Sequence, residues 1–75
     1  MPIVFSEYAK EKLEERKISQ KSALAVVQNP DRILASYRGR KLRQKQIGDT
    51  LLEAVTKTEG SRITIITIYI LEEQI

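Results

Sequence analysis

Hydrophobic and polar positions change their spacing at Pro30, which divides the chain into two parts. Before Pro30, apolar side chains recur every three to four residues, whereas after it they alternate every two. The most apolar stretch of the second part is 61–70, SRITIITIYI, in which β-branched residues dominate. So short a stretch cannot span a membrane, and stiff β-branched side chains favour a pleated strand. We therefore expect 61–70 to be an internal strand around which the other elements are organised.

Two helices are predicted in the first part, each beginning after a serine. Ser6 and Ser19 can accept hydrogen bonds from the free amides of a first helical turn. The first helix should run to about Arg16, and the second should comprise the segment QKSALAVVQ. Asn29-Pro30 then ends the second helix, because proline lacks the amide hydrogen and pushes the preceding residue out of helical geometry. Residues 2–5 form either an extended arm or a brief strand.

Glycine-bearing pairs punctuate the second part at intervals of about ten residues, at Gly39-Arg40, Gly48-Asp49 and Glu59-Gly60. Hairpin loops of two residues at these pairs predict strands over 32–38, 41–47, 50–57 and 61–70. The expected fold is a single α+β domain over residues 1–75. In it, two N-terminal helices pack on one face of a four-stranded antiparallel meander sheet.

These loops also fix a register, and the register predicts which side chains share a face of the sheet. The face expected to be open holds Leu34, Ser36, Arg38, Lys41, Arg43, Lys45, Leu52, Ala54, Ile65, Thr67 and Tyr69. The helices are expected to cover Ile33, Ala35, Tyr37, Leu42, Leu51, Val55, Ile66, Ile68 and Ile70. Gln44, Gln46 and Glu53 fit poorly on the covered face, which indicates a bulge or incomplete cover.

Composition excludes several kinds of site. The 75 residues include no cysteine and no histidine, which removes disulfides, zinc sites and Ser-His-Asp catalysis. No metal or cofactor is therefore expected. The N-terminal residues show neither a signal peptide nor a membrane anchor, and a cytoplasmic location is expected. A chain of this length buries only roughly 60% of its unfolded surface, so a dimer or a protein partner would help it, and Leu52, Ile63 and Ile65 on the open face would supply the contact.

Positive charge is concentrated on one predicted hairpin. The net charge is +3, and five of the 13 cations fall within eight residues without one acid: Arg38, Arg40, Lys41, Arg43 and Lys45. In the predicted register Arg38 faces Lys41, and like charges directly opposite are destabilising unless an anion neutralises them. The hairpin therefore predicts an anionic partner such as RNA. The alternative is a solvated face, on which long basic side chains lie over apolar surface with their charged ends in water.

Short motifs spread along the chain resemble a family of small bacterial and archaeal domains of unknown function. They are Tyr8-Ala9, Arg16-Lys17-Ile18-Ser19, Asn29-Pro30-Asp31 and Thr67-Ile68-Tyr69. Such domains resemble the RelE/ParE toxin superfamily, including the related BrnT toxins, in which two helices pack on a four-stranded antiparallel sheet. In this chain, Tyr8 stands where the family usually has histidine, and Lys17 replaces the customary glycine.

The resemblance implies a toxin of a toxin-antitoxin pair, either a metal-independent endoribonuclease acting on the ribosome or a gyrase poison. An antitoxin-like protein or a second copy of the chain would be its protein partner. For ribonuclease chemistry we predict that Lys41 and Arg43 clamp the phosphate, Lys45 assists, and Tyr69 orients or exchanges a proton. The alternative is a non-catalytic module, a decayed toxin that binds nucleic acid or protein. The absence of histidine favours the non-catalytic module, whereas the basic cluster together with Tyr69 favours the endoribonuclease.

Overall fold

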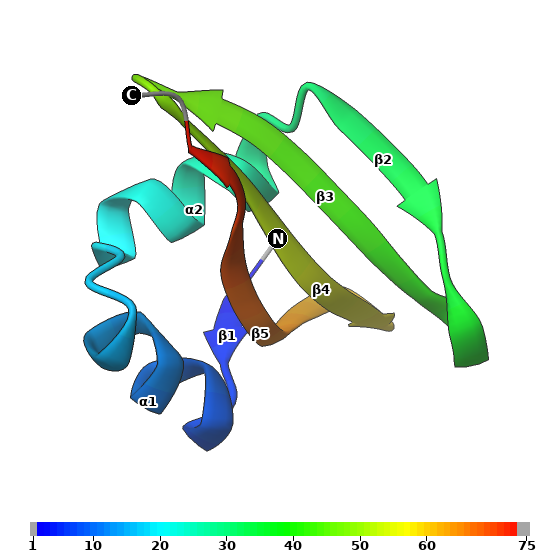
Figure 1. Ribbon diagram of the computed structural model, residues 1–75. Coiled ribbons are helices and arrows are strands. Elements are labelled where there is room, and N and C mark those ends of the chain that lie inside the picture. The colour runs from blue at the N-terminus through cyan, green and yellow to red at the C-terminus, as the bar shows by residue number, and fades with distance from the viewer. Residues whose placement is uncertain (1, 74–75) are drawn as a thin grey trace.

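Two helices lie against one face of a five-stranded mixed sheet (Figure 1), in a computed structural model that describes residues 2–73. The elements, in chain order, are β1 (Ile3–Phe5), α1 (Glu7–Glu15), α2 (Gln20–Gln28), β2 (Arg32–Ala35), a 3-10 turn η1 (Tyr37–Gly39), β3 (Arg40–Ile47), β4 (Thr50–Glu59) and β5 (Arg62–Glu73). Strand order across the sheet is β1-β5-β4-β3-β2, with β1 parallel to β5 and the other neighbours antiparallel.

The α+β class and the two helices are confirmed, but the expected four-stranded antiparallel sheet is wrong. The short apolar segment before α1 forms a fifth strand, which pairs in parallel with residues 63–65. It does so because Ile3 and Phe5 pack against the core. The amide of Ile63 also donates to the carbonyl of Pro2 at 3.0 Å, so the ladder extends beyond the strand itself. This fifth strand gives β5 neighbours on both sides, which confirms the internal position predicted for it.

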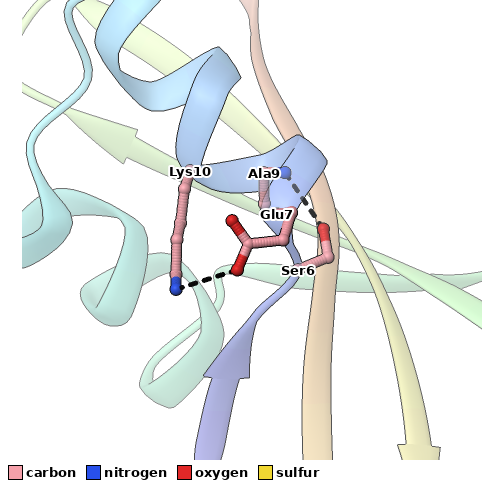
Figure 2. Close-up of polar contacts among 4 residues, drawn as sticks. All are labelled: Ser6, Glu7, Ala9 and Lys10. Carbon is pink, nitrogen blue, oxygen red and sulfur yellow. Dashed lines mark hydrogen bonds and ion pairs between the residues drawn. The ribbon is translucent and has the colours of Figure 1, made fainter.

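Serine caps begin both helices, as the sequence predicts. The hydroxyl oxygen of Ser6 accepts from the amide of Ala9 at 3.0 Å, while Glu7 pairs with Lys10 at 3.4 Å (Figure 2). The same hydroxyl donates to the carbonyl of Ile66 at 2.9 Å, so the cap also fastens α1 to β5. Ser19 caps α2 in the same way, accepting from the amide of Ser22 at 3.1 Å.

Only one of the three predicted hairpin loops has the expected register throughout its ladder. At Gly48-Asp49, Ile47 lies opposite Thr50, as predicted. Between β2 and β3 the predicted two-residue loop is wrong: the turn η1 intervenes and places Ala35, rather than Arg38, opposite Lys41. Between β4 and β5 the loop is Gly60-Ser61 rather than the predicted Glu59-Gly60, so Glu59 lies opposite Arg62, and the register shifts by one residue at each of two points further along. Because a shift by an odd number of residues moves side chains to the other face, both errors change the predicted faces.

The hydrophobic core lies between the helices and the face that was expected to be open. Its buried residues are Ala9, Leu13, Ile18, Ala23, Val26, Val27, Leu52, Ala54, Ile63, Ile65 and Ile68. Leu52, Ile63 and Ile65 are thus core residues, and the exposed apolar patch predicted from them is wrong. The helices pack here because this face of β4 and β5 offers aliphatic side chains, whereas the other face of the sheet carries Gln44 of β3 and Glu53 of β4 together with Leu42 and Val55.

Candidate nucleic-acid interface

The five cations predicted to bind RNA do not share one face. Lys41, Arg43 and Lys45 alternate along β3 on the side of the helices, where they lie opposite residues 56, 54 and 52 of β4. Arg40 points to the opposite side, since neighbouring strand residues face opposite ways. Arg38 lies in η1, in a left-handed conformation with φ +56°. The cluster is continuous in sequence but is divided by the sheet.

Arg43 and Lys45 hold the C-terminal end of α2. Arg43 donates to the hydroxyl of Thr56 at 3.0 Å and to the carbonyl of Val27 at 3.3 Å. Lys45 donates to the carbonyl of Asn29 at 2.9 Å and lies 3.6 Å from the carboxylate of Asp31. The last carbonyls of a helix lack partners within it and carry partial negative charge, which cations stabilise. These two cations therefore have a structural role within the chain.

Lys41 is exposed and lies beside them, at a groove between the end of α2 and the sheet. The groove has a volume of about 490 Å³ and is lined by Ile3, Val27, Gln28, Lys41, Arg43, Thr58 and Ile63. The hydroxyl of Thr56 donates to the carbonyl of Lys41 at 3.2 Å while accepting from Arg43. These two hydrogen bonds hold the backbone of Lys41 beside the groove, while the side chain of Lys41 is exposed.

A like-charge pair lies at the end of the sheet near η1. Arg40 of β3 is directly opposite Lys57 of β4, on the face away from the helices. The pair predicted between Arg38 and Lys41 is wrong, because Arg38 lies in η1 and Ala35 is the residue opposite Lys41. A like-charge pair is nevertheless present at the neighbouring position of β3. We call Arg38, Arg40, Lys41 and Lys57 the basic end. Among residues 2–73, no ion pair involves these four cations.

Sequence reasoning missed Lys57 as a member of the basic end. The signal was available, since the two-residue turn at Gly48-Asp49 fixes the register that places Lys57 opposite Arg40. Lys57 was overlooked because it lies outside the run of cations on β3.

Tyr37 was also missed, having been predicted to lie under the helices. It begins η1 instead, and its side chain is 87% exposed. With Ala35, Ser36 and Leu42 it lines an open hollow of about 510 Å³. Leu42 lies on the same face as Arg40, two residues further along β3. An exposed aromatic ring therefore adjoins the basic end, and the run Tyr37-Arg38-Gly39-Arg40 is the sequence signal that could have indicated it.

Tyr69 lies on the face opposite to Lys41, Arg43 and Lys45. It is paired with Glu53 of β4, and its hydroxyl donates a hydrogen bond to that carboxylate. Burial, followed by the hydrogen bond to Glu53 and its negative charge, raises the pKa of Tyr69 to about 12. The prediction that these four residues share a face, on which their joint catalytic role was based, is therefore wrong. Their individual roles in catalysis stay predictions.

The reason for the misplacement is a bulge in the β4–β5 ladder. Val55 pairs with Thr67, whereas the next residue of β4, Thr56, pairs with Ile65, so Ile66 has no direct partner. The bulge lies just beyond Ile65 and reverses the face of the β5 residues that follow, Tyr69 included. Gln44 and Glu53 fitted poorly on the face predicted to be covered for a different reason: the helices cover the other face of the sheet.

No His, Cys, Asp or Glu side chains of residues 2–73 gather in threes as metal ligands would. In that part of the chain no helix combines the length and apolar character needed to cross a membrane.

Comparison with known proteins gives one match. A family model described as Domain of unknown function (DUF4258) matches residues 5–70, a range that includes both helices, Tyr37 and the whole basic end. No curated protein and no solved structure matches the chain.

Proposed function

The chain belongs to the DUF4258 family, whose description names no activity, and we propose that it is an RNA-binding domain without catalysis of its own. The observation that carries the proposal is the placement of Arg40 directly opposite Lys57. Like charges across a β-ladder repel, and neither side chain has an acidic partner among the described residues. A polyanion bound at this end would replace that repulsion with attraction.

The distribution of the basic end favours a chain of phosphates over a single small anion. Arg40 and Lys57 lie on one face of the sheet, Lys41 lies on the other, and Arg38 lies in the turn between β2 and β3. One phosphate cannot contact side chains that point away from each other. A nucleic acid strand that passes over the end of the sheet can contact all four in succession, and phosphate contacts of this kind supply sequence-independent affinity.

The ribonuclease alternative has less support from the geometry. A general base for the 2′-hydroxyl must be deprotonated near neutral pH, and the raised pKa of Tyr69 keeps its phenol protonated there. Arg43 and Lys45 already bind carbonyls at the end of α2. We therefore propose the binding module in preference to the enzyme.

The toxin assignment is a further part of the proposal, supported by the sequence resemblance to the RelE/ParE superfamily. The motifs Arg16-Lys17-Ile18-Ser19 and Asn29-Pro30-Asp31 carry it. A decayed toxin of this type would bind RNA or the ribosome in the cytoplasm, and an antitoxin-like protein or a second copy of itself. The apolar patch that first supported a protein partner is buried, so this partner now rests on the resemblance.

Salt-dependent binding of a fluorescently labelled single-stranded RNA tests the proposal. If all four cations contact phosphates, the log–log slope of affinity against salt should be near −3, from about −0.7 for each contact. Lys57→Gln and Arg40→Gln should each weaken binding and make the slope shallower by about 0.7. Lys21→Gln, at an exposed position on α2, is the matched control and should leave both unchanged. Binding that is undetectable at low salt, or equally weakened by the control, contradicts the proposal.

Two further measurements separate the proposal from its alternative. Expression without a neighbouring antitoxin should leave growth unaffected if the domain only binds, whereas a ribonuclease toxin should arrest it. Cleavage of ribosome-bound message by the parent, lost in Tyr69→Phe, would reinstate the enzyme.

A further inference from the structure

The side chain of Tyr37 is far more exposed than those of the other two tyrosines. It is 87% exposed, against 52% for Tyr8, and Tyr69 is half-buried. The rings of Tyr8 and Tyr69 also face cations of the chain: Lys12 lies 5.2 Å from the first ring centroid and Arg16 lies 5.9 Å from the second. Among residues 2–73, no cation is placed over the ring of Tyr37 in this way. A large aromatic surface is thus left in water.

The turn that carries Tyr37 is held in place by its backbone. Arg38 and Gly39 both adopt left-handed conformations, with φ of +56° and +73°. The amide of Ser36 donates to the carbonyl of Arg40 at 2.9 Å and closes the turn. Tyr37 is therefore presented at a defined position and does not lie on a long loop, which lowers the entropy lost when a ligand stacks on it.

The surroundings of the ring combine apolar contact with positive charge. Tyr37 and Leu42 line the same hollow, and Leu42 is two residues from Arg40 on one face of β3. Residues two apart on a strand are separated by roughly 6.5 Å, so the hollow adjoins the Arg40–Lys57 pair. An aromatic platform beside cations that track a backbone is the arrangement by which proteins bind single-stranded nucleic acid.

We propose that Tyr37 stacks on an unpaired base while the basic end contacts the flanking phosphates, so that the domain selects single-stranded over duplex RNA. This inference rests on the proposed function and adds the class of RNA and the residue that recognises it. Bases within a duplex are stacked on both sides and cannot lie on the ring. Every base has an aromatic face, so binding should depend little on sequence.

The experiment compares three polyanions: single-stranded RNA, a duplex of the same length, and inorganic polyphosphate, which has no bases. Tyr37→Ala should weaken binding of the single strand by roughly five- to 150-fold, the range expected for loss of one base–aromatic stack. Its salt slope and its affinity for polyphosphate should not change, because no charge is removed. Tyr8→Ala is the matched control and should leave all three affinities unchanged.

Tyr37→Trp provides a second, direct readout, since the chain has no tryptophan of its own. The substituted protein should bind the single strand at least as tightly as the parent. Its fluorescence should be quenched by the single strand and unaffected by polyphosphate, because quenching requires a stacked base.

Each outcome separates this inference from the proposed function. A parent that binds neither RNA nor polyphosphate overturns both. If the parent binds with the expected salt slope but Tyr37→Ala loses no more than Tyr8→Ala, only the stacking role is overturned. Duplex binding as tight as single-strand binding, or a Tyr37→Trp protein whose fluorescence the single strand does not quench, likewise overturns the stacking role alone.

Discussion

Tyr69 of β5 donates a hydrogen bond to the carboxylate of Glu53, the residue directly opposite it on β4. Gln44 of β3 donates to the other carboxylate oxygen at 2.8 Å, which completes a polar row across three strands. Glu53 is only 5% exposed, and a buried carboxylate is costly unless donors satisfy it. The position of Tyr69 is therefore explained by its contribution to the stability of the sheet.

The first prediction concerns stability at alkaline pH. The pKa of Tyr69 is raised from 10.0 to about 12 in the folded protein, so the folded state holds this proton more tightly than the unfolded state. The resulting stabilisation is fully present below pH 10 and is lost as the pH rises through 12. It should amount to roughly 1–2 kcal/mol after allowance for solvent screening.

Urea unfolding of the parent and of Tyr69→Phe, measured from about pH 8 to about pH 12, tests this. The difference between their free energies of unfolding should shrink as the pH rises from 10 towards 12, because phenylalanine carries no titrating proton. A difference that stays constant with pH would contradict the raised pKa.

The second prediction concerns the energetic coupling of Glu53 and Tyr69. Glu53→Leu should reduce the free energy of unfolding by about 1–3 kcal/mol, because it leaves the Tyr69 hydroxyl and the Gln44 amide without their acceptor. In the Glu53→Leu protein, Tyr69→Phe should then lower the free energy of unfolding by less than it does in the parent. A double-mutant cycle should give a coupling of about 0.5–3 kcal/mol. Strictly additive effects would show that the hydrogen bond does not contribute.

Sequence reasoning succeeded where structure is determined by nearby residues. Ser6 and Ser19 cap the helices with side-chain hydrogen bonds to amides three residues on, and Pro30 ends the second helix without reference to the rest of the fold. The turn at Gly48-Asp49 likewise follows from two residues, one of them a glycine with φ of +60°.

The register of the sheet could not be predicted in the same way. Arg38 adopts a left-handed conformation that arginine rarely takes. The residues around Arg38 therefore do not indicate that η1 replaces a two-residue loop. The bulge beyond Ile65 falls within the run ITIITI, in which no glycine marks it. Cations close together in sequence could therefore be identified, whereas the face on which each lies, and the relation of Tyr69 to them, could not.

The third prediction separates the two neighbouring cations on the helix side of β3. Arg43→Gln should lower the free energy of unfolding by about 1–2 kcal/mol, because it removes bonds to Val27 and to the buried hydroxyl of Thr56. Lys41→Gln removes the same charge from an exposed position and should change stability by less than about 0.5 kcal/mol. Thermal or urea unfolding of the two proteins gives the comparison. Equal losses in both would mean that Arg43 does not stabilise the end of α2.

The last prediction concerns Lys17, at the junction between α1 and α2. Lys17 has φ of +55° and follows the end of α1. The amide of Lys17 donates to the carbonyl of Glu14 at 3.3 Å, and the amide of Ile18 donates to the carbonyl of Leu13 at 2.9 Å. These are the paired hydrogen bonds of a Schellman motif. Left-handed backbone is strained for a residue with a β-carbon, and glycine relieves that strain. Lys17→Gly should therefore raise the free energy of unfolding by about 0.5–1 kcal/mol.

Lys21→Gly is the matched control, because Lys21 is an exposed lysine in the first turn of α2 and does not have a positive φ. There glycine should lower the free energy of unfolding by up to about 1 kcal/mol, since it weakens a helix without relieving strain. Urea unfolding of the two proteins should thus show shifts of opposite sign for the same chemical change. Destabilisation of similar size at both positions would show that the junction between the helices tolerates lysine as readily as glycine, and that the left-handed φ of Lys17 does not destabilise the folded state.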